Sequence, residues 1–180
     1  MSKFSKQSIL LFIFSFLFIL VAQGQSEEKK DKIINDSEEA KEEFLKADWQ
    51  MDKWFKESTG YVIFPNVGKG GLGVGGAAGN GVLYENGTAI GMAKLTQISI
   101  GFQAGGQAYR EIIFFENADA LKRFKENNVE LSAQVSAVAA TVGASADAEY
   151  TEGVIVFTLQ KGGIMYEASV GGQKFKFNPF

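Results

Sequence analysis

Two amino acids are absent from this 180-residue chain: cysteine and histidine. Without cysteine, neither a disulfide framework nor a lipid-modified N-terminal cysteine can form. Without histidine, serine triads, Cys-His dyads and soft metal sites lack the side chain on which they depend. Most familiar hydrolase chemistry is therefore excluded, and we expect a chain that is not an enzyme and that uses neither a metal nor a cofactor.

The N-terminal segment lacks acidic residues and has a pattern of its own. Lys3 and Lys6 precede an uncharged run of 13 residues, 9–21, and small residues follow it. This order is typical of a secretory signal peptide, and the run is shorter than the roughly 20 residues of a membrane-spanning helix. We predict that residues 1–24 are a signal peptide cleaved before Gln25. The mature protein is then exported, either periplasmic or secreted, with peripheral membrane association.

The charge balance argues against a nucleic-acid partner. The chain has 18 basic and 21 acidic residues, and loss of Lys3 and Lys6 with the signal peptide leaves 16 basic residues and a net charge of −5. Binding through phosphate neutralisation needs the opposite balance. Length and composition indicate one domain. We predict a flexible charged linker over residues 25–37 and a single domain over residues 38–180.

The segment from Gln25 to Thr59 contains no glycine and predicts an amphipathic helix. Asp36 and Glu39 have the spacing of an N-cap and its N3 partner, and Gly60 is the natural stop. Apolar residues recur with the helical period of 3.6. They are Ala40, Phe44, Ala47, Met51, Trp54 and Phe55. Leu45 and Trp49 add apolar surface on another side, which either packs on the domain or contacts a membrane or partner.

Residues 60–110 hold 14 of the 21 glycines. The segment 68–73, GKGGLG, fits the dinucleotide-binding spacing G-x-G-x-x-G, but that loop must open a helix. The sequence that follows, VGGAAGNG, opposes a helix because each glycine costs about 1 kcal/mol relative to alanine. With a period of two, the segment is instead a strand with a structural glycine face of Gly71, Gly73 and Gly75. We expect a helix or an acyl chain against this face.

The remaining sequence alternates as antiparallel strands do, with one helical interruption. Residues 117–127 predict a short helix that begins at an asparagine cap. The last strand places Lys174 and Lys176 on one face and Phe175 and Phe177 on the other. We therefore predict an α+β fold: a strongly bent, barrel-like antiparallel sheet with Gly-rich strands, an N-terminal amphipathic helix and the short helix near 117–127.

Three segments carry a resemblance to a known family: GYVIFPNVGKGGLGVGGAAGNGVLYENG, SIGFQAGGQAYREIIFFEN and GVIVFTLQKGGIMYEASVGG. In this order they resemble the SYLF domain, also known as the Ysc84 actin-binding domain, over residues 38–177. The resemblance implies a non-enzymatic module that associates with lipid or membranes, here in the bacterial cell envelope. Eukaryotic members bind phosphoinositides and, in some cases, actin. A structural or partner-binding envelope protein without a lipid ligand is the alternative.

In those eukaryotic members, lipid binding is attributed largely to an N-terminal amphipathic segment. The matching region of this chain is residues 38–57. Residues 26–57 contain 7 basic and 11 acidic residues, so we expect burial to contribute more than charge. Truncating Trp49 should then weaken membrane binding more than truncating Lys174. The candidate contacts with lipid are Leu45, Trp49, Trp54, Lys69, Lys161, Lys174 and Lys176.

Overall fold

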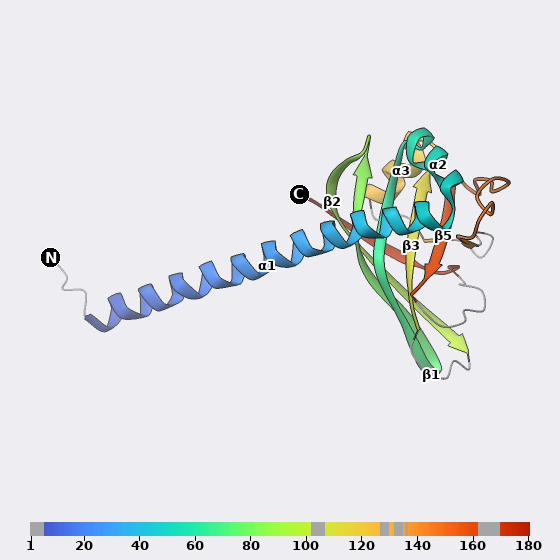
Figure 1. Ribbon diagram of the computed structural model, residues 1–180. Helices are drawn as coiled ribbons and strands as arrows, with labels where there is room; N and C mark the ends of the chain where they lie inside the picture. The colour runs from blue at the N-terminus through green and yellow to red at the C-terminus, as the bar shows by residue number, and fades with distance from the viewer. Residues whose placement is uncertain (1–5, 102–106, 127–129, 132–134, 136, 162–169) are drawn as a thin grey trace. The chain divides into compact units, whose positions relative to one another are not determined.

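The computed structural model describes residues 6–101, 107–126, 130–131, 135, 137–161 and 170–180. The chain divides into two units, residues 1–32 and residues 33–180. The elements in chain order are α1 (Lys6–Ala47), η1 (Trp49–Met51), α2 (Asp52–Glu57), β1 (Gly60–Glu85), β2 (Thr88–Gly101), β3 (Gln107–Phe115), α3 (Ala118–Lys125), β4 (Ala137–Ala139), β5 (Val154–Gln160) and β6 (Lys174–Pro179) (Figure 1).

The first unit contains the N-terminal part of α1. Residues 25–37, for which the sequence predicts a flexible linker, are helical, and Asp36 lies inside α1 instead of capping it. The absence of glycine and proline and the many Glu and Lys residues favour this continuation. Lys30 forms an ion pair with Glu27 one turn earlier, at 3.6 Å. Among the described residues, no helix combines the length and apolar composition required to cross a membrane.

The second unit is built around one mixed sheet, which confirms the α+β class. The strand order is β4-β5-β3-β1-β2-β6. All neighbours pair antiparallel except β4 and β5, which are parallel. In Figure 1, β1 and β2 extend away from α2 and α3 toward the opposite end of the sheet.

The long strand β1 folds back on itself. Its first part, Gly60–Lys69, pairs with β3, whereas its second part, Gly73–Glu85, pairs with β2. A Cβ at Gly60 would lie 2.8 Å from the Tyr84 carbonyl oxygen, and one at Gly79 would lie 3.0 Å from the Asn66 carbonyl oxygen. The two parts therefore lie side by side, and β1 contributes two adjacent strands to the sheet.

The barrel-like part of the predicted fold is not supported, because the sheet is open. β4 and β6 are its two edges, and no described residue of one pairs with the other. Both edges are short, since β4 has 3 residues and β6 has 6. Helices cover the two apolar faces of the sheet instead, α3 on one and the end of α1 with α2 on the other.

Each face of the sheet has its own core. The first core packs α3 against the sheet through Leu121 and Phe124, together with Phe64 and Phe175. The second core packs the end of α1 and α2 against the opposite face, with Phe44 and Trp54 among its members. The predicted short helix is confirmed as α3, since the Asn117 side chain accepts a hydrogen bond from the Ala120 N–H at 3.0 Å.

The glycines of β1 allow backbones to approach closely. Gly75 is buried, while the surroundings of Gly71 and Gly73 lie outside the described part of the chain. At Gly81 a Cβ would collide with the carbonyl oxygen of Ile63 on the first part of β1, and at Gly76 it would lie 2.9 Å from the Gln97 carbonyl oxygen. Neighbouring strands thus occupy the space that side chains would need.

Candidate functional site

The helix predicted to run to Gly60 ends at Ala47, and the helix breaks at Asp48. This residue has an extended backbone, with φ −147° and ψ 100°, and caps η1 by accepting the Gln50 N–H at 3.1 Å. Its second carboxylate oxygen accepts the N–H of Ser145 at 2.9 Å. The prediction of one continuous helix from Asp36 is therefore wrong, because a partner 97 positions away stabilises the break.

Asp48 is 1% exposed, which is unusual for an aspartate. Burial raises the pKa of the carboxyl, but hydrogen bonds from Ser145, Gly143 and Gln50 outweigh it, so the pKa lies below its usual value. Donors that bind the ionised form have this effect. Asp48 is thus a buried anion that connects the start of η1 to the loop that contains Ser145.

The break at Asp48 sends the two tryptophans in different directions. Trp49 is 70% exposed, whereas Trp54 is 7% exposed. The Trp54 indole donates to the Ser145 carbonyl oxygen at 3.2 Å and packs its ring against Phe114 and Phe157. Trp54 therefore belongs to the second core and not to an exposed contact surface, because α2 starts a new helical phase after the break.

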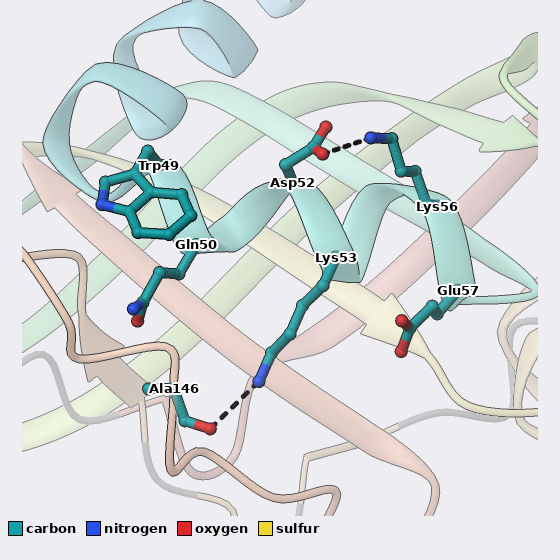
Figure 2. A pocket seen from close by; sticks show the side chains of 7 residues that line it. All are labelled: Trp49, Gln50, Asp52, Lys53, Lys56, Glu57 and Ala146. Carbon is teal, nitrogen blue, oxygen red and sulfur yellow. Dashed lines mark hydrogen bonds and ion pairs between the residues drawn. The ribbon is translucent and has the colours of Figure 1, made fainter.

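Trp49 borders a surface pocket of about 460 Å³. Figure 2 shows the indole at one side of this pocket, with Gln50, the side chains of α2 and Ala146 along the rest. Lys53 Nζ donates to the Ala146 carbonyl oxygen at 3.0 Å, and Lys56 forms an ion pair with Asp52. The residues that line this Trp49 pocket are Trp49, Gln50, Asp52, Lys53, Lys56, Glu57 and Ala146.

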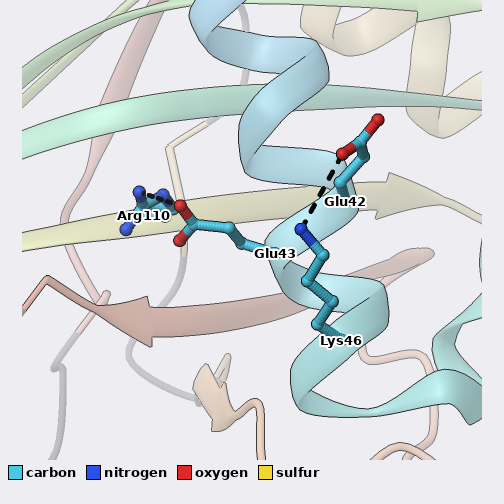
Figure 3. A network of polar contacts seen from close by, with 4 residues as sticks. All are labelled: Glu42, Glu43, Lys46 and Arg110. Atoms are coloured by element: carbon cyan, nitrogen blue, oxygen red, sulfur yellow. Dashed lines mark hydrogen bonds and ion pairs between the residues drawn. The ribbon is translucent and has the colours of Figure 1, made fainter.

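An ion pair holds the end of α1 on the sheet just before Trp49. Arg110 of β3 donates to Glu43 of α1 at 2.7 Å, and the arginine side chain is only 11% exposed (Figure 3). Glu42 and Lys46 form a longer and exposed pair at 3.9 Å on the same helix. Because the Glu43–Arg110 pair is largely shielded from water, it fixes the position from which the chain turns at Asp48.

The other predicted contacts do not join the Trp49 pocket. Leu45 is half-buried and packs against the second core. Lys69 is half-buried in β1, and Lys161 is exposed directly after β5. Lys174 and Lys176 are exposed on β6. Of the predicted residues, the pocket contains Trp49 alone.

Sequence reasoning missed Lys53 and Lys56, although a signal for them exists. They follow Trp49 by four and seven positions, which is the spacing of one helix face. Ala146 had no such signal, since the turn that contains it reaches the pocket only in the folded chain. Within the described residues, no group of three acidic side chains gathers in the way a metal site requires.

A second buried carboxylate lies behind β6. Glu111 of β3 is fully buried and accepts a hydrogen bond from Gln173 Nε2 at 2.9 Å. Its other carboxylate oxygen has no hydrogen-bond partner among the described residues. Burial raises the pKa of Glu111 to about 8, and the single bond from Gln173 only partly offsets it. Gln173 immediately precedes Lys174, so this pair fixes the start of β6.

Comparison of the sequence with known proteins finds one family match, in the C-terminal part of the chain. A family model described as Ysc84, Las17-binding protein actin regulator, matches residues 96–178, which run from the end of β2 through β6. This confirms the predicted resemblance to the SYLF (Ysc84) family over the matched segment, 83 of the 180 residues. The matched segment contains Glu111 and both lysines of β6, whereas the Trp49 pocket lies mainly before it. No curated protein matches the chain. The match over this segment suggests a binding module.

Proposed function

We propose that this protein is a non-enzymatic binding module that associates with lipid membranes through the Trp49 pocket. The exposed indole of Trp49 carries the proposal, since it is 70% exposed beside a buried carboxylate that holds it there. Tryptophan has an apolar ring and a polar N–H, a combination favoured at the boundary between headgroups and acyl chains.

The charges around Trp49 suit a surface of mixed charge. Asp52 and Glu57 balance the charges of Lys53 and Lys56 in the lining, so the site has little net charge of its own. Zwitterionic headgroups present a phosphate and an ammonium group to such a site. Burial of the indole then contributes about 2 kcal/mol to the binding free energy, the value for a large apolar side chain.

Export to the bacterial cell envelope forms part of this proposal. The N-terminal pattern of two lysines, an uncharged run and small residues supports a signal peptide. The alternative is a partner-binding envelope protein without a lipid ligand. The description of the matched family as a Las17-binding actin regulator favours a protein partner, and it gives this alternative its support.

Two measurements on the purified mature chain test the proposal. Mass spectrometry of a solvent extract should detect co-purified lipid, and the protein should float with phosphatidylcholine vesicles in a density gradient. Trp49→Ala should reduce flotation about 30-fold, while Phe180→Ala, which truncates another exposed aromatic residue, should leave it unchanged. Wild-type protein that carries no lipid and ignores vesicles of every composition would sink the proposal and favour the partner-binding alternative.

A further inference from the structure

Strand pairing gathers three lysines on the exposed face of β2 and β6. Lys94 pairs with Lys176, and Thr96 pairs with Lys174. All four side chains are exposed. Paired residues of an antiparallel ladder share one face of the sheet, where adjacent strands lie about 4.8 Å apart and alternate residues about 7 Å apart. The three ammonium groups therefore form one patch.

This patch is unfavourable for the isolated protein. Like charges directly opposite each other in a ladder destabilise the pair, and Lys94 and Lys176 are in that position. The chain has a net charge of −3, so the cluster does not follow from a general excess of lysine. Glu130 lies 3.5 Å from Lys174 Nζ and offsets one of the three charges. Positions at which a sequence departs from such local rules are often functional.

An apolar side chain continues the same face. Ile98, two residues beyond Thr96 on β2, is 83% exposed. It lies opposite Gly76 in the register, and two residues further along Ile100 pairs with Val74. A pocket of about 340 Å³ borders this position, lined by Thr96, Gln97, Ile98, Glu130, Gly172 and Lys174. The face thus passes from basic to apolar within a few residues.

We propose that Lys94, Lys174, Lys176 and Ile98 form a docking surface for an anionic lipid bilayer, separate from the Trp49 pocket. We name it the lysine face. A bilayer presents phosphates above an apolar layer, in the same order as the lysines and Ile98, whereas an acidic protein matches the lysines alone. The inference rests on the proposed function, because both concern lipid.

Charge-neutralising variants test the lysine face. The double variant Lys94→Gln/Lys176→Gln should bind vesicles of phosphatidylcholine with about one-third phosphatidylglycerol about 30-fold more weakly, which corresponds to about 1 kcal/mol per lysine. The matched control Lys46→Gln/Lys122→Gln removes the same charge from exposed positions on α1 and α3 and should lose less than about 3-fold. Ile98→Ser should weaken the binding that remains at high salt.

Each outcome bears on one of the two proposals. Equal losses for the two double variants would overturn the lysine face, because only overall charge would then matter. Binding to polyglutamate that depends on Lys94 and Lys176, without dependence on anionic lipid, would overturn it in favour of an acidic protein partner. Wild-type protein that binds neither neutral nor anionic vesicles would overturn the proposed function as well. Vesicle binding that is lost in Trp49→Ala but unchanged in Lys94→Gln/Lys176→Gln would overturn the lysine face alone.

Discussion

The Trp49 pocket and the lysine face are each backed by a buried carboxylate, but the two carboxylates differ in charge state. Asp48 precedes Trp49 and receives hydrogen bonds from the N–H groups of Gln50 and Ser145. Glu111 lies behind the start of β6 and receives one bond, from Gln173. The pKa of Asp48 is lowered, whereas burial raises that of Glu111 to about 8.

The difference shows that hydrogen-bond donors, and not burial alone, decide whether a buried acid is ionised. Asp48 is ionised at neutral pH and acts as an anchor by virtue of its charge. Glu111 is mainly protonated at pH 7 and stabilises the start of β6 as a neutral group. Acidification should therefore destabilise the structure around the Trp49 pocket, whereas alkaline pH should destabilise the start of β6.

The largest expected effect follows from removing the Asp48 anchor. Asp48→Ala leaves the buried N–H of Ser145 without its acceptor and removes the cap of η1. We expect the free energy of unfolding to fall by about 3 kcal/mol, since hydrogen bonds to a charged group contribute about 1.5–3 kcal/mol each. Urea denaturation followed by circular dichroism measures this loss.

Asp48→Asn is the matched control, because it keeps the shape and one acceptor oxygen and should lose about half as much. Stability from Asp48 is present above the ordinary aspartate pKa, about 3.9, and is lost as pH falls through the lower folded value. The wild type should therefore lose more stability than Asp48→Ala on acidification below pH 4. Parallel curves for the two proteins would contradict the ionised anchor.

A smaller effect is expected where β6 meets β2. Gly91 pairs with Pro179, and a Cβ there would lie 2.6 Å from the Asn178 carbonyl oxygen and closer still to the Phe177 ring. Gly91→Ala should lower the free energy of unfolding by about 2 kcal/mol through overpacking. Gly68→Ala, where a Cβ meets no described atom within 4 Å, should change it by less than about 0.5 kcal/mol. Equal thermal midpoints for both variants would show that this contact relaxes freely.

Raising the pH above 7 should lower the free energy of unfolding through Glu111 and not through Asp48. The folded pKa of Glu111 is raised, so the folded state loses stability as pH rises toward about 8. Between pH 7 and 9 this loss amounts to about 1 kcal/mol. Glu111→Gln cannot ionise and should lose less over the same interval, as measured by urea denaturation at both pH values. An identical slope for Glu111→Gln would show that Glu111 is already ionised at pH 7.

Salt should produce the smallest effect and should sharpen the contrast between the two surfaces. Raising sodium chloride from about 0.1 M to about 0.5 M screens exposed lysines and should weaken flotation with anionic vesicles by roughly 3- to 10-fold. Flotation with phosphatidylcholine vesicles should change less than about 2-fold, because burial of Trp49 is not screened. Equal salt sensitivity on both vesicle types would remove the distinction between the surfaces.

Sequence patterns correctly predicted the elements that are determined by residues close together in the chain. The asparagine cap and the apolar spacing of α3 identified that helix, and alternation placed Phe175 inward and Lys174 outward in β6. In both cases the residues that determine the structure are near neighbours in the chain, so their spacing carries the information.

Contacts between distant residues were not accessible in this way. The helix breaks at Asp48 because of Ser145, and this break gives Trp49 and Trp54 opposite environments although they are five positions apart. Lys94 belongs with Lys176 only through the register of two strands 82 positions apart. The sequence shows where the lysines are in the chain, but it does not show which of them pair across the two strands.

Fluorescence of Trp49 tests the central claim most directly, because the chain contains only 2 tryptophans and the other is buried. In Trp54→Phe, whose fold is checked by circular dichroism, Trp49 is the sole indole emitter. Adding vesicles should shift its emission to shorter wavelength, and lipids brominated near the headgroup should quench it, because the indole enters the headgroup boundary. Unchanged, unquenched emission from protein that nevertheless floats with the vesicles would contradict the account.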